Sequence, residues 1–503
     1  MEHTARLRKP ACLWCACAVL AVYAGAAQAQ TIATLYSFDG TDGEVPYAAL
    51  VQGTNGDLYG TTYGGGPMAN CDGTGCGTVF RITPGGKLTT LHYFCSQGAY
   101  PDCPDGAYGM GLVVAANGDI YGTTWLGGEN RGGTIFRVAP GGELTTVYSF
   151  CAQSGCADGK YAQGLVQASN GYLYGTTYGG GSSTAFSDGA GTVFRITLGG
   201  KLTTLYSFCL QDACPDGNAP NPQLAQSTNG DLYGTTSGSG ANSAGTFFKI
   251  TPSGKLTTLY SFCSQTACTD GIGPLAGPIQ ANDGNFYGTT SGGGANSSGT
   301  VFKITPSGKL TTLYSFCSES ECVDGDQPLA GLVQATDGNL YGTTRYGGFE
   351  DCCGTAFRIT LGGTLTSYSI CPGEGCTYPG DQPGAGLVQD TNGVLYGTTQ
   401  SGGDECLGSA DPGCGTVFTL SMGLGPFVKT LPITGAAGAA VKILGTDLTG
   451  ATSVTFNGTA AAFTVVSSSE ITTTVPAGAT SGTVEVVTPS GTLLSNVAFQ
   501  VSQ

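Results

Sequence analysis

Six aspartates precede a glycine at the same place in a recurring pattern of this 503-residue sequence. They are Asp42, Asp105, Asp158, Asp216, Asp270 and Asp324, and the seventh copy carries Pro379-Gly380 instead. Hard cations such as Ca²⁺ prefer oxygen ligands, so convergence of these carboxylates would create a calcium site. The alternative is structural, because an Asp beside a glycine commonly closes an Asx turn. The sequence therefore predicts no cofactor other than calcium, and it leaves calcium open.

Aromatic residues recur just after a Thr-Thr pair, and these are Tyr63, Trp125, Tyr178 and Tyr346. Exposed aromatic rings can stack on sugar rings or anchor a protein partner. The alternative is that each ring packs against a neighbouring loop. Together with the six aspartates, these four aromatic residues are the candidate binding residues.

Catalytic constellations are sparse in this sequence. His92 is the only histidine beyond residue 3, so no pattern of a Ser-His-Asp triad is visible. Two carboxylates suffice for glycoside hydrolysis, and the only adjacent acidic pairs in the sequence are Glu350-Asp351 and Asp404-Glu405. Both pairs lie in variable loops, where solvated charge is the simpler interpretation. We therefore expect a non-catalytic binding protein, with an extracellular hydrolase or lyase as the alternative.

Most of the 21 cysteines come in close pairs. These pairs are Cys71/Cys76, Cys95/Cys103, Cys151/Cys156, Cys209/Cys214, Cys263/Cys268, Cys317/Cys322, Cys371/Cys376 and Cys406/Cys414, and Cys352-Cys353 is a further candidate. In an exported chain such spacing predicts local disulfides, whereas a set of metal sites is the alternative.

The N-terminus has the pattern of a secretory signal. Basic residues between positions 6 and 9 precede an apolar stretch at 11–24, and cleavage is predicted after Ala29. That stretch is short for a membrane span, so no span is expected after the signal is removed. The net charge of −16 disfavours nucleic acid as a partner. These features predict a secreted or cell-surface protein.

A tetrapeptide, Tyr-Gly-Thr-Thr, marks an internal repeat. It begins at Tyr59, Tyr121, Tyr174, Tyr233, Tyr287, Tyr341 and Tyr396, so the copies are 53 to 62 residues apart. Each copy contains four short runs rich in β-branched and aromatic residues, separated by Gly, Asn, Asp and Pro, which predicts four strands joined by tight turns. A repeat of this length indicates one structural unit that stacks on its neighbours.

Seven four-stranded units predict an all-β fold with a seven-bladed β-propeller over residues 30–424, after a signal peptide at 1–29. The open solenoid is the alternative. Residues 34–38 match a fourth strand but precede the first unit, and the seventh unit stops after residue 418 without one. We therefore expect the N-terminal strand to complete the last blade, which closes the ring and removes an exposed sheet edge.

Residues 425–503 differ in composition, because Val, Thr, Ala and Ser dominate and cysteine is absent. Several short alternating runs predict a small β-sandwich. Gly445-Thr446-Asp447-Leu448, Val454-Thr455-Phe456-Asn457-Gly458 and Val475-Pro476-Ala477-Gly478 resemble the IPT/TIG family of immunoglobulin-like domains. That resemblance implies an interaction or spacer module without catalytic residues.

The repeats themselves are similar to the GloVer tandem repeat of secreted bacterial proteins. The similarity is carried by Gly331-Leu332-Val333-Gln334, by Asp337-Gly338-Asn339-Leu340-Tyr341-Gly342-Thr343-Thr344 and by Gly299-Thr300-Val301-Phe302-Lys303-Ile304. The resemblance implies location and fold but no established reaction. The expected function is therefore a secreted or surface-attached binding protein whose partner is an extracellular glycan or protein.

Overall fold

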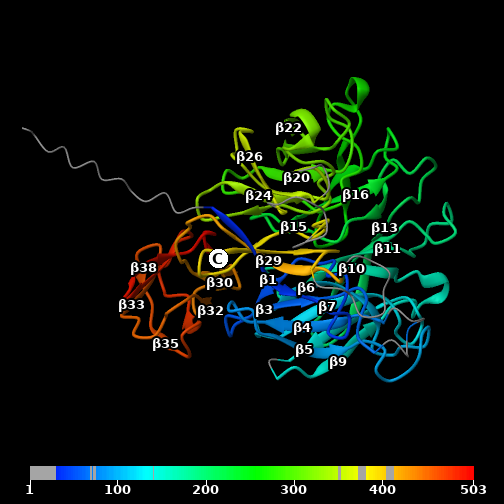
Figure 1. Ribbon diagram of the computed structural model, residues 1–503. Coiled ribbons are helices and arrows are strands. Elements are labelled where there is room, and N and C mark those ends of the chain that lie inside the picture. The colour runs from blue at the N-terminus through cyan, green and yellow to red at the C-terminus, as the bar shows by residue number, and fades with distance from the viewer. Residues whose placement is uncertain are drawn as a thin grey trace, which may run out of the picture.

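The computed structural model describes residues 30–67, 71, 75–139, 141–348, 353–371, 381–403 and 413–502 (Figure 1). These residues form β-strands and three short 3-10 turns, η2 (Ser154–Cys156), η3 (Thr266–Cys268) and η4 (Ser320–Cys322). In these ranges no helix has the length and apolar character needed to cross a membrane. The all-β class is confirmed, whereas the signal peptide lies outside the described residues and stays a prediction.

Each of the first three repeats forms a four-stranded antiparallel sheet with its strands in chain order. Repeat sheet 1 contains β2 (Val51–Gln52), β3 (Leu58–Thr61), β4 (Thr78–Ile82) and β5 (Leu88–Tyr93). Repeat sheet 2 contains β6 (Ala107–Val114), β7 (Ile120–Leu126), β8 (Thr134–Val138) and β9 (Leu144–Ser149). Repeat sheet 3 contains β10 (Lys160–Gln167), β11 (Leu173–Gly179), β12 (Thr192–Ile196) and β13 (Leu202–Ser207).

The next three repeats follow the same order with shorter first strands. Repeat sheet 4 contains β14 (Asn218–Pro220) and β15 (Ala225–Gln226), which both pair with β16 (Leu232–Gly238), and then β17 (Thr246–Ile250) and β18 (Leu256–Ser261). Repeat sheet 5 contains β19 (Ile279–Gln280), β20 (Phe286–Thr290), β21 (Thr300–Ile304) and β22 (Leu310–Ser315). Repeat sheet 6 contains β23 (Val333–Gln334), β24 (Leu340–Thr344), β25 (Thr355–Ile359) and β26 (Leu365–Ser369).

Repeat sheet 7 combines the two ends of the repeat region. It contains β27 (Val388–Gln389), β28 (Leu395–Thr399) and β29 (Thr416–Ser421), and its fourth strand is β1 (Thr31–Ser37). β1 runs antiparallel to β29, with Thr31 opposite Ser421 and Ser37 opposite Thr416. The N-terminal segment therefore covers the strand edge that the last repeat would otherwise expose.

The tyrosine and glycine of the tetrapeptide shape the second strand of each sheet. Tyr59 is 5 % exposed and, like its equivalents, packs at the boundary with the next sheet. Gly60 lies against the ring of Phe80, and a Cβ atom at Gly60 would stand 2.4 Å from the Phe80 ring. The glycine is therefore required because a phenylalanine of the third strand occupies the space of its side chain.

The two threonines of the tetrapeptide form different hydrogen bonds. The Thr61 hydroxyl donates to the backbone carbonyl of Met110 in the next sheet, at 2.7 Å. The Thr62 hydroxyl lies 3.0 Å from the hydroxyl of Thr78, which begins the third strand. The first threonine thus ties neighbouring sheets together and the second ties strands within one sheet.

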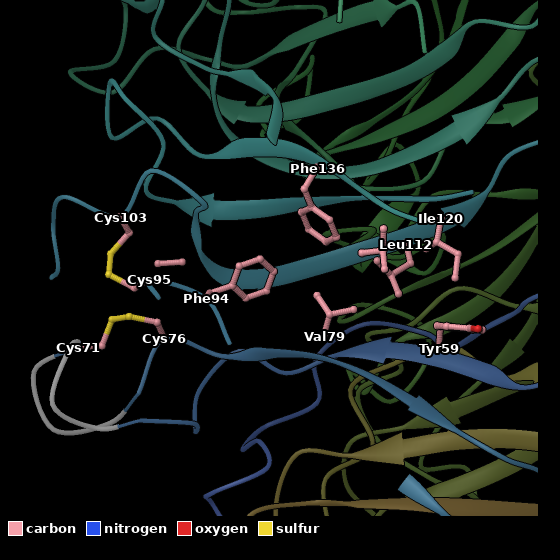
Figure 2. Packing of buried hydrophobic residues seen from close by; sticks show 12 residues of the cluster. Tyr59, Cys71, Cys76, Val79, Phe94, Cys95, Cys103, Leu112, Ile120 and Phe136 are labelled. Atoms are coloured by element: carbon pink, nitrogen blue, oxygen red, sulfur yellow. A yellow bond between two sulfur atoms is a disulfide. The ribbon is translucent and has the colours of Figure 1, made fainter. Parts of the chain in front are cut away.

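Hydrophobic clusters join each repeat sheet to the next. In Figure 2, Tyr59 and Val79 of sheet 1 face Leu112, Ile120 and Phe136 of sheet 2. Equivalent clusters join sheets 2 and 3, 3 and 4, 4 and 5, 5 and 6, and 6 and 7. A last cluster joins sheet 7 to sheet 1 and includes Phe38, which follows β1. The packing contacts therefore run in a cycle.

Residues 429–501 form the C-terminal sheets. One sheet contains β30 (Lys429–Leu431), β32 (Ala440–Leu444), β36 (Glu470–Thr474) and β35 (Phe463–Val465). The other contains β34 (Thr459–Ala460), β33 (Ser453–Phe456), β37 (Val484–Thr488) and β38 (Gly491–Leu494), and β31 (Thr434–Gly435) pairs with β39 (Gln500–Val501). The two four-stranded sheets share one apolar core, which includes Ile443 and Ile471 from the first and Val454, Phe456 and Val486 from the second.

The C-terminal sheets contact the turns that join first and second strands. The Ser469 hydroxyl donates to the carbonyl of Thr54 at 3.1 Å, and Lys429 Nζ donates to Gln52 Oε1 at 3.2 Å. In Figure 1 these strands, orange to red, stand to one side of the repeat sheets. We call the face of the repeat sheets that carries the turns between first and second strands the hairpin rim. The opposite face, the loop rim, carries the loops between second and third strands and the loops between sheets.

Candidate functional site at the loop rim

The Asp-Gly carboxylates hold the loops between sheets in place. Asp158 accepts hydrogen bonds from the Tyr148 hydroxyl at 2.9 Å and from the backbone N–H groups of Ala152 and Gln153 at 3.0 and 3.1 Å. The same tyrosine-to-aspartate bond is made by Tyr36 to Asp42, Tyr206 to Asp216, Tyr260 to Asp270 and Tyr314 to Asp324. Each aspartate thus binds groups that precede it in the chain, at or before the start of its own loop. The expected Asx turn would instead place its partners on residues that follow it.

These bonds leave the carboxylates unsuited to shared cation binding. Asp158 and Asp270 are fully buried, and each is surrounded by donors of its own loop. Burial acts to raise the pKa of Asp270, but hydrogen bonds from Tyr260 and the loop backbone outweigh it and lower that pKa. Burial and the bond to Asp270 raise the pKa of Tyr260 to about 12. Among the described residues, the aspartates form no group of three or more metal ligands.

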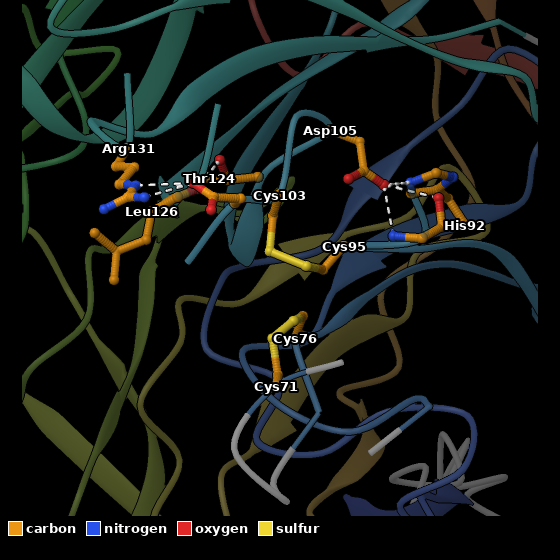
Figure 3. Close-up of a disulfide and its surroundings, with 11 residues drawn as sticks. Cys71, Cys76, His92, Cys95, Cys103, Asp105, Thr124, Leu126 and Arg131 are labelled. Atoms are coloured by element: carbon orange, nitrogen blue, oxygen red, sulfur yellow. Dashed lines mark hydrogen bonds and ion pairs between the residues drawn. A yellow bond between two sulfur atoms is a disulfide. The ribbon is translucent and has the colours of Figure 1, made fainter. Parts of the chain in front are cut away.

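A serine, a histidine and an aspartate do meet in sheet 1, but not as a triad. His92 stands where other repeats have tyrosine, and its Nε2 lies 2.8 Å from Asp105 Oδ2 (Figure 3). The Ser96 hydroxyl donates to the same oxygen at 2.9 Å. A triad needs the histidine between the hydroxyl and the carboxylate. Here both groups bind the carboxylate, so the trio closes a loop.

Disulfides staple the loop rim. The structure contains six of the expected bonds, Cys71–Cys76, Cys95–Cys103, Cys151–Cys156, Cys209–Cys214, Cys263–Cys268 and Cys317–Cys322. Cys414 is also disulfide-bonded, whereas its expected partner Cys406 lies outside the described residues. The first two bonds are neighbours (Figure 3). The Sγ atoms of their four cysteines all lie within 4.8 Å of one another.

Two expected pairings in sheet 6 are wrong. Cys371 was expected to bond to Cys376, and Cys353 was a candidate for a vicinal bond to Cys352. Instead Cys353 and Cys371 bond to each other, with Cα atoms 5.7 Å apart. The register of β25 with β26 explains the change, because it places residues 353 and 371 opposite one another just beyond the paired strand ends. The sequence predicted bonds between cysteines that are close along the chain, whereas pairing of β25 with β26 brings two distant cysteines together. Cys352 and Cys376 lie outside the described residues.

Aromatic side chains gather on sheets 1 to 3 at the loop rim. Tyr63 stacks on Tyr108 of the next sheet with ring centres 4.6 Å apart, and Trp125 stacks on Tyr161 of the next sheet at 5.0 Å. Tyr178 lies against Trp125 at 5.3 Å and is 44 % exposed. We call Tyr47, Tyr63, Tyr108, Trp125, Tyr161 and Tyr178 the aromatic arc. The structure therefore brings Trp125 and Tyr178 into contact, whereas Tyr63 contacts Tyr108 in a second group of rings.

Tyr346 does not belong to this arrangement. A bridge pairs it with Asp326 as another pairs Gly64 with Glu44, so Tyr346 is the equivalent of Gly64 rather than of Tyr63. The residue at the Tyr63 position in sheet 6 is Arg345, whose guanidinium lies 5.1 Å from the centre of the Tyr346 ring. The predicted grouping of Tyr346 with Trp125 was one residue out of register.

A central cavity of about 660 Å³ is lined by residues from all seven repeat sheets. At the loop rim its lining includes the residue five positions after each Asp-Gly aspartate or its proline counterpart. Six residue types occupy these seven positions, which are Tyr47, Met110, Gln163, Asn221, Leu275, Leu329 and Gly384. Tyr47 and Leu275 are exposed, and Trp125 and Tyr178 of the aromatic arc also line the cavity.

The central cavity is lined mainly by apolar, aromatic and amide side chains. Among the described residues that line it, none is an aspartate or a glutamate. Glycoside hydrolysis requires two carboxyl groups beside the scissile bond. The acidic pairs Glu350-Asp351 and Asp404-Glu405 lie outside the described residues. Aromatic rings and side-chain amides, such as that of Gln163, are in contrast typical of a ligand pocket.

Sequence reasoning missed Tyr47, Tyr108, Tyr161 and Lys429. The sequence held a signal for Tyr108 and Tyr161. The other repeats carry an X-Pro pair at the equivalent position, as at Val45-Pro46, whereas sheets 2 and 3 have Tyr108-Gly and Tyr161-Ala. The backbone is left-handed here, with φ of 65° at Tyr108 and 63° at Tyr161. The equivalent residues of other repeats share this conformation, with φ of 53° at Val45 and 54° at Gln327, so the conformation belongs to the repeat and only the aromatic side chain is particular to sheets 2 and 3.

The chain belongs to the Gloeobacter/Verrucomicrobia repeat family. The family model matches residues 21–187, 74–273, 154–322 and 264–467. The expected likeness of the repeats to the GloVer pattern is therefore confirmed. A search of curated protein sequences finds no significant match.

Several solved structures with propeller-like folds have a similar arrangement of strands. A fungal alcohol oxidase of the AA5 family, in complex with copper, is 13 % identical with a TM-score of 0.51, and the match covers 94 % of this chain and 99 % of that one. A putative gluconolactonase is 12 % identical over 79 % of this chain and 94 % of that one, with a TM-score of 0.40. A PQQ-bound aldose sugar dehydrogenase from Streptomyces coelicolor is 15 % identical over 62 % of this chain and 93 % of that one, with a TM-score of 0.38. At such low sequence identity, these similarities show a shared fold and nothing about activity.

Proposed function

We propose that this protein is a secreted, non-catalytic glycan-binding protein whose ligand site is the mouth of the central cavity. One observation carries the proposal: aromatic residues occupy the positions at which the repeats differ, and they do so around a cavity. Tyr47, Trp125 and Tyr178 line that cavity and combine apolar faces with polar edges, which suits the faces and hydroxyls of sugar rings. Gln163 and Asn221 add side-chain amides for specificity.

The proposed architecture is a closed seven-bladed β-propeller, residues 30–424, followed by an IPT/TIG-like sandwich at residues 425–503. Support for closure comes from the pairing of β1 with β29 and from the cluster that joins sheet 7 to sheet 1. Support for the sandwich comes from the shared core of the two C-terminal four-stranded sheets. A rigid propeller would hold the loop rim in a fixed geometry, which is the usual arrangement of a binding site.

The proposed location is extracellular, after cleavage behind Ala29. The disulfides of the loop rim support it, because such bonds persist in oxidising compartments. N-terminal sequencing of the exported chain checks this point. A first residue of Gln30 is expected, and retention of the signal in the cell would contradict the proposal.

A glycan array on the purified mature protein, with and without calcium, tests the function. Binding of a set of related glycans is expected in both conditions. Dependence on calcium would restore the cation hypothesis for the Asp-Gly loops. Release of sugar during the assay would favour the alternative function, a hydrolase or lyase. Silence on every glycan would contradict the proposal in favour of a protein partner.

A further inference from the structure

Lys429 stands at the inner end of the central cavity. It begins β30 of the C-terminal sheets and lines the central cavity together with Asn496 and Val497 of the loop between β38 and β39. It also lines a second cavity of about 330 Å³ between the repeat sheets and β30, beside Thr430 and Leu431. The C-terminal sheets thus supply one end of a cavity whose mouth is built by the repeats.

Lys429 is the only charged residue among the described residues that line the central cavity. The surrounding wall consists of side chains such as Val51, Val333 and Val388 and of amides such as Gln163. The chain as a whole has a formal charge of −16. The lining of the central cavity therefore has one positive charge and no negative charge, although the protein as a whole is strongly acidic.

The ammonium group of Lys429 is only partly satisfied by the protein. It donates to Gln52 Oε1 at 3.2 Å and makes a close contact with the backbone carbonyl of Gln389. Nζ also lies 5.4 Å from the centre of the Phe427 ring. An ammonium has three N–H donors, so these two hydrogen bonds leave one donor for the ring face or for an incoming acceptor. No carboxylate oxygen of the described residues lies within 4 Å of Nζ; Asp390 acts on it only at longer range.

The electrostatics of this neighbourhood favour an added anion. Burial lowers the pKa of Lys429 to about 8, although Asp390 opposes the shift. Burial raises the pKa of Asp390, and Asp57 adds a smaller effect in the same direction. A desolvated cation without a contacting counter-ion gains more from an incoming carboxylate than an exposed lysine does.

We propose that the central cavity receives the carboxylate-bearing end of an acidic glycan, with that carboxylate paired to Lys429. This inference rests on the glycan binding proposed above. One terminal uronic acid fits, because its ring would lie against the apolar wall at the inner end while its single charge meets the single cation. The following sugars would then reach the aromatic mouth. A polyuronate is disfavoured, since the remaining charges would face an acidic surface.

Calorimetric titration of the mature protein with two trisaccharides tests the inference. The probes are cellotriose and the same trisaccharide ending in glucuronic acid at its non-reducing end. At pH 6.5 we expect at least tenfold tighter binding of the acidic probe. At pH 9.5 that preference should disappear, because Lys429 loses its proton above a pKa of about 8.

Four variants assign the preference to Lys429. Lys429→Met should remove the preference for the acidic probe, whereas Lys429→Arg and Asp390→Asn should keep it. Lys442→Met is the matched control, because Lys442 lies on the neighbouring strand β32, bonds to Glu470 at 2.6 Å and does not line the cavity. Thermal unfolding of each variant verifies the fold.

The outcomes separate the inference from the proposed function. Equal affinity for both probes, or a preference that survives in Lys429→Met, overturns the inference and leaves glycan binding intact. Binding of neither probe also overturns the inference, and a silent glycan array would in addition overturn the proposed function.

Discussion

Repeat sheets 1 to 3 and repeat sheets 4 to 6 share one scaffold and present different surfaces. Both groups keep the tetrapeptide, the strand order and the clusters between sheets. They differ at the residue after Thr-Thr, which is aromatic in the first group, at Tyr63, Trp125 and Tyr178, and is Ser237, Ser291 or Arg345 in the second. The repeated residues build the fold, and the departures from the repeat build the site.

Side-chain length explains the contrast. Ser291 is short, so its hydroxyl donates to the carbonyl of Gly273 at 2.9 Å within its own sheet. Trp125 is long enough to cross the boundary and to stack on Tyr161 of the next sheet. Serine therefore seals each loop by itself, whereas an aromatic residue couples two sheets and leaves ring surface at the cavity mouth.

The contrast presupposes one continuous cycle of sheets, and the largest expected effect tests that cycle. Deletion of residues 30–38 removes β1 and the buried Phe38, so we expect loss of cooperative folding or a fall in the melting temperature of at least about 10 °C. Phe38→Ala should cost about 3–5 kcal/mol, as much as Phe262→Ala in sheet 4. An unchanged melting temperature of the deletion variant would show that the cycle is open.

Cysteine removal should affect sheets 1 and 5 differently. Sheet 5 follows a single loop disulfide, and Cys263→Ser with Cys268→Ser should lower the unfolding free energy by about 2 kcal/mol through lost loop closure. In sheet 1, Cys76 and Cys95 take the cross-strand positions that Cys353 and Cys371 take in sheet 6. We therefore expect Cys71→Ser with Cys103→Ser to leave a Cys76–Cys95 bond.

Peptide mapping by mass spectrometry and thermal unfolding check this prediction. The double serine variant of sheet 1 should contain the new bond and lose less stability than the sheet 5 variant. Free thiols at both positions 76 and 95 would refute the cross-strand equivalence.

Ring removal should weaken binding only in the first group of sheets. Trp125→Ala removes a ring that lines the cavity and supports Tyr178, so glycan affinity should fall at least tenfold, about 1.4 kcal/mol. Ser291→Ala should leave the affinity within twofold. Tyr93→Ala serves as the aromatic control, because Tyr93 is exposed but does not line the cavity. Similar losses in all three variants would remove the distinction between the groups.

The smallest expected effect concerns the turns at the hairpin rim. Burial acts to raise the pKa of Asp283 in sheet 5, but Lys303, at 2.8 Å, and other donors lower it to about 2. Its ionised form therefore stabilises the fold above about pH 4, and this contribution is lost as the pH falls towards 2. In sheet 1, burial raises the pKa of Asp57, with Arg81 only at 3.5 Å.

Asp283→Asn should accordingly lower stability at pH 6 by less than about 1 kcal/mol, since the pair is largely exposed to solvent. Asp57→Asn should not lower it. Chemical denaturation at pH 6 and pH 2 measures both differences. Destabilisation of equal size in the two variants would contradict the opposite pKa shifts.

Much of the fold could be predicted because its determinants are local. Alternating apolar residues and Asn-Gly or Asp-Gly turns predicted four strands per repeat, and the unmatched residues 34–38 predicted the pairing of β1 with β29. Local cysteine pairs were predicted for the same reason. Cys371 was assigned wrongly, because its partner Cys353 is close across a sheet and distant along the chain.

The candidate site could be predicted only in part. Tyr63, Trp125 and Tyr178 stood out because aromatic residues recur just after the Thr-Thr pair. Tyr47 and Lys429 carried no comparable signal, since their importance depends on which residues from other segments face them. The hypothesis that six aspartates share a cation did not take into account that each is held by a tyrosine or histidine of the preceding strand.

The sequence by itself determined the repeat unit, its strands and turns, and the match between the last repeat and the N-terminal strand, because neighbouring residues specify backbone conformation and alternation. Tertiary structure decided the rest: the stacking of Trp125 on Tyr161, the Cys353–Cys371 bond and the position of Lys429 at the inner end of a cavity. Each of these brings together atoms from segments that the chain keeps apart. Packing of one sheet on the next fixes such distances, and no local pattern records them.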